Sequence, residues 1–310
     1  MSSLVPTFSV ITPVYNGETY IEETILSVLK SCQEVNFEYI VINDGSTDNT
    51  ATVIERFSDK IKIISQNNKG ESKSVNVGIE TSRGEYLIVV SADDPLLGPE
   101  IFRGVEELFK TKPNLVALYP DWQIIDEHGE LLEIKRVPNY SIEDFVGKNY
   151  VLPGPGTIFR REAAIKIGGR RSIWKFVGDY DFWLRMSDEG FFIHRNQVLG
   201  QWRHHPSSTS ISARGPEMAS ERINVIADFL DNSKQKISKK IARMALGNAY
   251  AIAARLIFFS TQVPGKKYLL KSLQTGRRWP SRLSALETLY IVLHPLSKKL
   301  IFPFRKRILR

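Results

Sequence analysis

The segments FSVITPVYN (residues 8–16), FEYIVINDGS (37–46) and EYLIVVSADD (85–94) decide the fold. Each is a run of strand-forming apolar residues that ends in polar or turn-forming residues. Between the first two segments, apolar side chains recur at the spacing of one helix face, at Ile21, Ile25, Val28, Leu29 and Cys32. This alternation of strand and helix predicts a mostly parallel sheet with helices on both faces.

The same alternation continues along the chain. We expect a helix that runs to Phe57, further helices at 70–82 and 99–111, strands at 61–64 and 115–120, and a hairpin around His128-Gly129. The following part, up to residue 212, is mixed and rich in glycine, aromatic residues and arginine. We therefore expect residues 1–215 to form one α/β domain with a Rossmann-like sheet.

Residues 216–310 are expected to form a basic helical region. Helix-spaced apolar residues predict helices at 217–231, 235–259, 265–276 and 281–293. Residues 233–310 contain 18 Lys or Arg and one acid, which gives a charge of +17. Residues 1–232 contain 24 Lys or Arg and 33 Asp or Glu, which gives −9. A basic block of this size indicates an anionic partner.

Two anionic partners suit the basic region, namely a membrane surface and nucleic acid. Cationic and apolar residues are mixed over residues 298–310, as is typical of interfacial membrane segments. No recognisable nucleic-acid-binding module accompanies the charge, so we expect an anionic membrane surface and no nucleic acid. A helical lid with a solvated basic face is the alternative that needs neither partner.

Composition and the N-terminal residues indicate the compartment. Cys32 is the only cysteine, which excludes an internal disulfide framework and fits a reducing compartment. The N-terminal residues lack a charged segment followed by a long apolar run, so no secretory signal is predicted. The sequence has no uncharged apolar stretch of about 18 residues, so no transmembrane helix is predicted. We expect a cytoplasmic protein that lies peripherally on the inner face of the cell membrane.

Polar residues at the ends of three predicted strands mark a candidate site. They are Tyr15-Asn16, Asn43-Asp44 and the run Ser91–Asp94. In an open parallel sheet, ligands bind beyond the carboxyl ends of the strands, where strand order reverses. Each loop alone fits ordinary turn chemistry, but three such loops on neighbouring strands favour a common site. The sequence contains no P-loop and no GxGxxG motif, which argues against an ATPase or a dinucleotide dehydrogenase.

The pair Asp93-Asp94 points to a metal. Two carboxylates that follow a buried strand are costly unless a cation compensates them. A hard divalent ion such as Mg²⁺ or Mn²⁺ binds few protein carboxylates and keeps positions for phosphate oxygens. Such an ion would neutralise charge on a departing diphosphate. In the alternative, both acids face solvent in a turn before Pro95.

Four segments together resemble glycosyltransferase family 2, whose members have the GT-A fold. The segments are FSVITPVYNGETYIEETILSVL (8–29), FEYIVINDGSTDNT (37–50), QNNKGESKSVNVGIETSRGEYLIVVSADD (66–94) and GDYDFWLRMSDEGFFIHRNQVLGQWRHHPSSTS (178–210). They occur in the family's order and cover roughly residues 7–212. The combination is much more specific than any one of the motifs alone.

The resemblance implies which residues bind the nucleotide. Pro13, Tyr15 and Asn16 match the motif of the first strand that holds the base. Asp44 matches the acid that accepts a hydrogen bond from the base, usually uracil; as an alternative, it serves as the turn residue that caps the next helix. Ser91 stands where an aspartate commonly contacts the ribose or the metal, and a neutral hydroxyl should bind more weakly there.

The resemblance also implies a divalent metal, Mn²⁺ or Mg²⁺. Asp93 matches the acid that ligates this metal, and Asp94 follows it in the same stretch. His205, at the end of the segment WRHH, is a further candidate that would contact the diphosphate or the metal. Gly70 would allow close approach of the backbone to the ligand, or it simply precedes a helix.

Asp179 matches the family's general base. An inverting transferase needs a base that takes the proton of the attacking hydroxyl group. Asp179 lies just before the amphipathic segment that starts at Asp181, so it can also cap that helix, and the two roles are compatible. Asp181 is the second candidate for the base, although it is expected inside the first turn.

The resemblance therefore implies an inverting, metal-assisted glycosyltransferase of polysaccharide or cell-envelope biosynthesis. It would move a sugar from a nucleoside diphosphate, most often UDP, to a hydroxyl of a glycan or lipid-linked acceptor. The alternative is a non-catalytic member that binds a nucleotide-sugar or a glycan, and the replacement at Ser91 motivates it. Asp179 and the helix that follows favour the enzyme, because a pure binding module needs no base.

Overall fold

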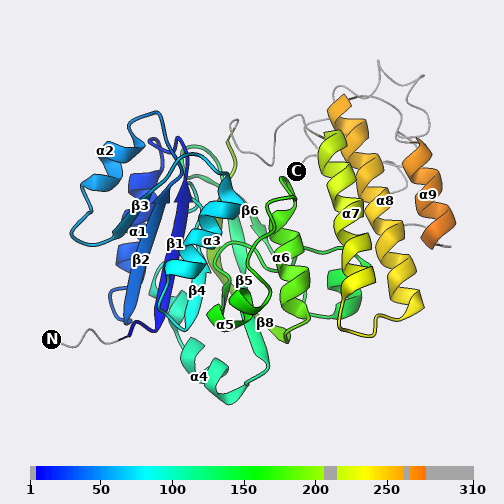
Figure 1. Cartoon of the computed structure of the whole chain (residues 1–310), viewed down its shortest axis with the longest axis horizontal. Helices are drawn as coiled ribbons and strands as arrows, with labels where there is room; N and C mark the ends of the chain where they lie inside the picture. Colours follow the sequence, from blue (N-terminus) through cyan, green and yellow to red (C-terminus); the bar gives the residue numbers. More distant parts are fainter. Residues whose placement is uncertain (1–4, 206–214, 262–265, 277–310) are drawn as a thin grey trace. The chain divides into compact units, whose positions relative to one another are not determined.

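The structure is a computed structural model that describes residues 5–205, 215–261 and 266–276 (Figure 1). The described residues fall into two compact units. The first unit comprises residues 5–140 and 151–205, and the second comprises residues 141–150 together with the described residues after 214. The short segment 141–150 thus belongs with helices that lie far away in the sequence.

The first unit is an α/β unit around a single sheet. Its elements, in chain order, are β1 (Phe8–Val14), α1 (Ile21–Ser31), β2 (Phe37–Asn43), α2 (Thr50–Glu55), β3 (Lys62–Ser65), α3 (Glu71–Thr81), β4 (Tyr86–Val89), the 3₁₀ helix η1 (Pro99–Phe102), α4 (Val105–Thr111), β5 (Leu115–Ile125), β6 (Leu131–Lys135), β7 (Ile158–Arg160), α5 (Arg161–Lys166), α6 (Gly178–Ser187) and β8 (Phe191–Arg203). The expected strands and the hairpin of β5 and β6 are confirmed, and β5 extends five residues beyond its predicted end at residue 120.

Strand order in the sheet is β3-β2-β1-β4-β7-β5-β6, and β8 pairs with β5. β1 is parallel to both β2 and β4, and β5 is parallel to β8. Because β7 is antiparallel to β4 and to β5, the strands β4, β5 and β8 run in one direction. Their carboxyl ends therefore share one edge of the sheet with those of β1 and β2. Strand order reverses at β1, which is the usual place for a ligand in such sheets.

Helices pack on both faces of this sheet. On one face, Ile21 and Ile25 of α1 pack into a buried apolar cluster with Val10 of β1. The next strand residue, Ile11, points to the other face, where α3 packs so closely that a Cβ atom at Gly78 would lie 2.3 Å from Cγ2 of Ile11. The predicted two-sided, mostly parallel arrangement is confirmed (Figure 1).

The expected helix at 99–111 is wrong as a single element. The structure has a short 3₁₀ helix, η1, and then α4, which begins at Val105. Between them Arg103 is extended, and Gly104 has a φ of 69°. A left-handed residue cannot continue a right-handed helix, and glycine adopts that conformation at little cost. The helical spacing of apolar residues therefore continues in the sequence although the helix itself is interrupted.

The second unit contains the π-helical turn η2 (Glu143–Gly147), α7 (Gly215–Asn232), α8 (Lys239–Thr261) and α9 (Lys266–Gly276). The helices expected up to residue 276 are confirmed; the helix expected at 281–293 and the basic segment 298–310 lie outside the described residues. The Asn248 side chain donates a hydrogen bond to the Gly147 carbonyl over 2.9 Å, which joins η2 to α8. None of the described helices has the length and hydropathy that crossing a bilayer requires.

Candidate active site

The loop after β1 is hydrogen-bonded to the loop after β2. The Thr47 N–H donates to Oδ1 of Asn16 over 2.8 Å, and the Asn16 N–H donates to the Ser46 hydroxyl over 3.0 Å. Asn16 has a φ of 52°, which asparagine tolerates better than most residues. Tyr15 is 51% exposed and Pro13 is half-buried. The Tyr15 ring is therefore open to a ligand at the carboxyl end of β1.

Asp44 directly follows β2 and is only 3% exposed. Its Oδ1 accepts hydrogen bonds from Nε2 of Gln66 at 2.7 Å and from the Lys69 N–H at 2.9 Å. Its Oδ2 accepts one from the Gly70 N–H at 2.8 Å. Gly70 has a φ of 89°, which glycine adopts readily, and this conformation lets two successive N–H groups point at one carboxylate. Since a carboxylate has about four acceptor positions, Asp44 keeps about one for a ligand.

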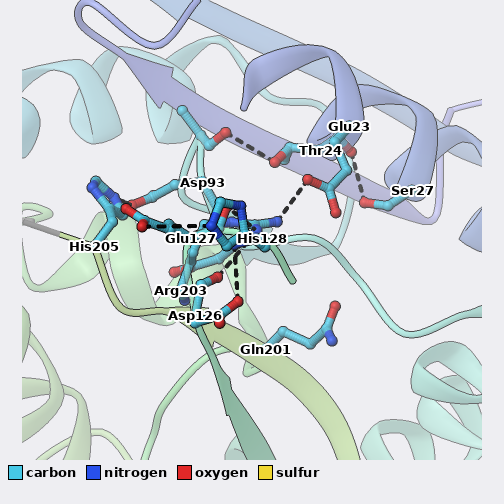
Figure 2. A network of polar contacts seen from close by, with 12 residues as sticks. Glu23, Thr24, Ser27, Asp93, Asp126, Glu127, His128, Gln201, Arg203 and His205 are labelled. Carbon is cyan, nitrogen blue, oxygen red and sulfur yellow. Dashed lines mark hydrogen bonds and ion pairs between the residues drawn. The ribbon is translucent and has the colours of Figure 1, made fainter. Parts of the chain in front are cut away.

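The loop after β4 is bound to helix α1. The Thr24 hydroxyl donates to the Ala92 carbonyl over 2.9 Å, and the Leu96 N–H donates to the Ser27 hydroxyl over 3.0 Å. Figure 2 shows these α1 side chains above the loop after β4 that carries Asp93 and Asp94, hereafter the acidic loop. The loop that carries the two acids is thus fixed by the helix that covers the core of the sheet.

Asp94 lies on the inner side of this loop and is 7% exposed. The Arg203 N–H donates to its Oδ1 over 2.8 Å, and the Ser91 hydroxyl also hydrogen-bonds to it. Burial, followed by the negative charge of Asp93, raises the pKa of Asp94 to about 8, against the opposing effect of the hydrogen bonds. Asp94 and Ser91 thus make contacts within the loop, while Ser91 remains exposed to a ligand.

Asp93 and His205 face one another. Nε2 of His205 lies 2.8 Å from Oδ2 of Asp93. The His205 side chain is 10% exposed and the Asp93 side chain is 30% exposed. The His205 ring packs on Tyr20 with 5.1 Å between ring centroids. The carboxyl ends of β4 and β8 share the sheet edge, so residues 112 positions apart in the sequence meet here.

These two side chains fit a divalent metal that keeps open positions. They offer a carboxylate oxygen and an imidazole nitrogen, both of which are metal ligands. Within the described part of the chain, no cluster of three or more His, Cys, Asp or Glu side chains is arranged to hold a metal. Among the described residues, an ion held by Asp93 and His205 would thus have positions left for phosphate oxygens or water.

Asp179 and Asp181 both lie in the first turn of α6, in opposite environments. Asp179 is exposed, and its Oδ1 accepts a hydrogen bond from the Tyr180 N–H over 2.7 Å. Asp181 is 1% exposed, and its Oδ2 accepts hydrogen bonds from Nε of Arg171 and Nε of Arg185, each over 3.0 Å. An acceptor hydroxyl can reach the first carboxylate, whereas it would have to displace an arginine from the second.

The start of α6 lies beside the start of α3. A Cβ atom at Gly178 would be 3.2 Å from Oγ of Ser72, and the N–H of Gly70, two residues before Ser72, holds Asp44. Asp179 therefore lies at the same edge of the sheet as Asp44. Asp93 follows β4, whose carboxyl end lies at this edge too.

Comparison with known proteins decides the family. Residues 9–168, which are more than half of the chain, match the model of glycosyl transferase family 2. The chain belongs to this family. It is therefore a glycosyltransferase, and the expectation of a family 2 enzyme is confirmed.

The relatives of this family 2 glycosyltransferase extend over most of its length. An uncharacterized glycosyltransferase of Rickettsia typhi is 28% identical over 285 residues, which cover 88% of this chain and 86% of the relative. S. aureus TarS 1-349 in complex with UDP-GlcNAc is similar in structure, with a TM-score of 0.65 and 17% identity over 86% of this chain and 79% of that one. The mannosyltransferase PcManGT from Pyrobaculum calidifontis, in complex with GDP-Man and Mn²⁺, gives a TM-score of 0.54 at 15% identity, over 96% of this chain and 88% of that one. These structures confirm the GT-A fold.

The contacts of two residues at the candidate site were not predicted. Gln66 holds Asp44, and Arg203 contacts the loop that carries Asp93 and Asp94. Gln66 lies within residues 9–168, which match the family, and Arg203 lies beyond them; their partners are 22 and about 110 positions away in the sequence. Local spacing carries no signal for such contacts. The available signal for Arg203 was a charged residue at the end of a strand.

Proposed function

We propose that this glycosyltransferase moves a sugar from a UDP-sugar to a hydroxyl of a glycan or lipid-linked acceptor, with inversion at the anomeric carbon. The observation that carries the proposal is an exposed carboxylate, Asp179, at the sheet edge that also holds Asp44 and Asp93. Support for the donor comes from S. aureus TarS, which shares the fold and has been solved with UDP-GlcNAc.

The environment of Asp44 supports uracil as the base. Three protein donors already occupy this carboxylate, which leaves about one acceptor position, on Oδ2. Uracil offers a single imide N–H at its pairing edge and would occupy that position. Guanine presents two adjacent donors, which a carboxylate binds best with both oxygens free. The ring of Tyr15, at the carboxyl end of β1, would stack on the base.

In the proposed reaction, Asp179 acts as the general base. Its carboxylate takes the proton of the acceptor hydroxyl while that oxygen attacks the anomeric carbon. A new carbon–oxygen bond forms on the face opposite the bond to the diphosphate, which breaks and releases UDP. Asp179 suits this role because it is exposed, whereas Asp181 is engaged by two arginines. The Tyr180 N–H, which donates to Asp179, orients the carboxylate.

Asp93 and His205 are the side chains that we propose for a bound Mn²⁺ or Mg²⁺. A metal in this place supplies positive charge that stabilises the departing diphosphate. Support comes from the proximity of the two side chains, which are hydrogen-bonded over 2.8 Å, and from PcManGT, which has the same fold and was solved with Mn²⁺. Ser91 offers a hydroxyl to the ribose instead of a carboxylate.

We further propose that the basic second unit docks on an anionic membrane surface, at the inner face of the membrane in the cytoplasm. Lys239, Lys240 and Arg243 of α8 are exposed, and the charge excess lies almost entirely in residues after 232. A membrane-bound location would bring the enzyme to a lipid-linked acceptor.

The variant Asp179→Asn tests the function. It keeps the size of the side chain but removes the base, so UDP release from a panel of UDP-sugars, including UDP-GlcNAc, should fall about 100-fold or more. UDP affinity, measured by calorimetry, should stay at the wild-type value. Asp188→Asn, at the other end of the same helix, is the control. Undiminished turnover in Asp179→Asn would remove Asp179 as the base.

A further inference from the structure

Arg203 is the largest of the nearly fully buried side chains among the described residues, and it is charged. The residue is 1% exposed at the carboxyl end of β8. A buried guanidinium is costly unless hydrogen bonds and an opposite charge compensate it. Replacement of such a group by a packed apolar side chain is often neutral or stabilising. Its presence here therefore needs a reason beyond packing.

The polar groups of Arg203 are directed at the acidic loop. Its backbone N–H donates to Oδ1 of Asp94 over 2.8 Å, and its Nε donates to the carbonyl of Asp93 over 3.0 Å. One side-chain nitrogen donates to Oε2 of Glu23 over 2.6 Å, which balances the charge. The other donates to the carbonyls of Asp126 and Glu127 over 3.3 and 3.4 Å (Figure 2). A single side chain thus joins α1, the acidic loop and the turn after β5.

Tyr20 connects Arg203 to His205. The guanidinium carbon lies 4.7 Å from the centroid of the Tyr20 ring, and the His205 ring lies 5.1 Å from the same centroid. A cation over an aromatic ring is attracted by it, so Arg203 holds the ring against which the imidazole packs. Both the backbone of Asp93 and the support of His205 therefore depend on one guanidinium.

We propose that Arg203 is a positioning residue that fixes the backbone of Asp93 and, through Tyr20, the ring of His205, so that their side chains meet at one point. The inference rests on the proposed metal-binding role of Asp93 and His205. Ligands that are held in place before the metal arrives bind it more tightly, because less conformational freedom is lost. Arg203 contacts neither the sugar nor the metal in this proposal.

The test compares metal affinity with nucleotide affinity. Arg203→Lys keeps the charge but loses the fork that reaches several partners at once. In the presence of UDP, Mn²⁺ affinity measured by electron paramagnetic resonance should fall about 10- to 100-fold, as is typical of residues that orient metal ligands. UDP affinity without metal should be unchanged. A role limited to stability would instead lower both affinities together or leave both as they are, and that result would overturn the inference.

Arg195→Lys is the matched control. Arg195 lies on the same strand, is partly buried and also donates to carbonyls, those of Glu100 at 3.1 Å and Arg103 at 3.2 Å. None of these groups belongs to the acidic loop. Mn²⁺ affinity should therefore remain at the wild-type value in this variant, and an equal loss in Arg195→Lys and Arg203→Lys would contradict the inference.

A second pair of variants leaves the buried arginine intact. Tyr20→Phe keeps the ring and should retain Mn²⁺ affinity, whereas Tyr20→Leu removes the ring and should weaken it. Asp93→Asn separates the two proposals. If Mn²⁺ affinity is unchanged in Asp93→Asn, the metal-binding role itself fails. If it falls there but not in Arg203→Lys or Tyr20→Leu, the metal-binding role stands and positioning by Arg203 fails.

Discussion

At the scale of single residues, the site depends on how many protein donors each acid already has. Asp44 receives three hydrogen bonds, two of them from backbone N–H groups of the same loop. Asp179 accepts a hydrogen bond from the N–H of the adjacent residue and is open to solvent. The first is a rigid acceptor with about one acceptor position left, and the second is a carboxylate that a substrate can reach.

Asp44→Asn should weaken both stability and nucleotide binding. The new NH₂ group would face N–H donors where an oxygen accepts them now, so the free energy of unfolding should fall by about 1–3 kcal/mol in urea titrations. UDP affinity should fall about 10-fold or more. Asp59→Asn, at an exposed position, is the control for the loss of charge. Unchanged UDP affinity in Asp44→Asn would contradict a contact between Asp44 and the base.

The three acids could be proposed for the site from the sequence because each lies in a contiguous motif. Asp44 and Asp93 follow apolar runs, and Asp179 precedes an amphipathic segment, so a short stretch identifies each. The residues that hold them could not be predicted. Arg203 contacts Glu23 across 180 positions, and such a contact exists only after the strands have paired. Tertiary pairing, rather than local pattern, selects these residues.

At the scale of elements, the first turn of α6 carries two aspartates, Asp179 and Asp181, whose substitution should affect stability differently. Asp181→Asn leaves two arginines without their carboxylate, so the free energy of unfolding should fall by about 3–5 kcal/mol. Asp179→Asn should change it by less than about 0.5 kcal/mol, as expected of an exposed position. Urea titration of both variants measures the difference. Equal losses would mean that Asp179 is also a structural residue.

β5 and β8 are joined by a buried carboxylate, Asp121. Burial alone would raise its pKa, but hydrogen bonds from the Val137 N–H, Arg136 and His194 outweigh this effect, so the pKa lies below the ordinary value of 3.8. Because the pKa of Asp121 is lower in the folded protein than its ordinary value, the carboxylate stabilises the fold at pH values above that ordinary pKa. This contribution is lost as the pH falls through the lowered pKa. The contacts thus make the pair of strands sensitive to acid.

Asp121→Asn should therefore lower the free energy of unfolding by about 1–3 kcal/mol at neutral pH. The difference from the wild type should shrink as the pH falls below about 4, because the wild-type carboxylate is then protonated as well. Urea titrations at a series of pH values measure it. Glu133→Gln on the exposed strand β6 should give a small difference. A difference for Asp121→Asn that is independent of pH would contradict this account.

Element boundaries show the limit of periodicity. α1 and α3 were predicted closely because neither is interrupted by a break in the backbone and each has a buried face at helical spacing. The helix expected at 99–111 breaks at Gly104. Apolar side chains recur at helical spacing on both sides of this residue, so the spacing alone does not indicate the break. β8 was not predicted as a single strand, because its long pairing with β5 joins segments more than 70 residues apart.

At the scale of the whole molecule, charge was predictable and the division into units was only partly so. Net charge is additive, so the basic carboxyl-terminal part is evident from composition alone. Segment 141–150 joins the helical unit because Gly147 leaves room for Met244, whose Cε would lie 2.2 Å from a Cβ atom at that position, and because Asn149 donates to the Ala245 carbonyl. Nothing in the local sequence indicates these contacts across about 100 residues.

The charge of the second unit should decide whether the enzyme associates with membranes. Neutralising Lys239, Lys240 and Arg243 with glutamine removes three exposed cations, each worth about 1 kcal/mol at an anionic surface. Binding to phosphatidylserine-containing vesicles, measured by flotation, should therefore weaken roughly 100-fold. Electrostatic attraction also requires that binding of the wild type falls as the salt concentration rises.

The control makes the same change of charge in the first unit. Lys60, Lys62 and Lys112 are exposed there, and their replacement by glutamine lowers the net charge by the same three units. If the second unit docks on the membrane, this variant should float with the vesicles almost as well as the wild type. Equal weakening by both triple variants would show a response to net charge alone, and equal binding by all three proteins would remove α8 from the membrane contact.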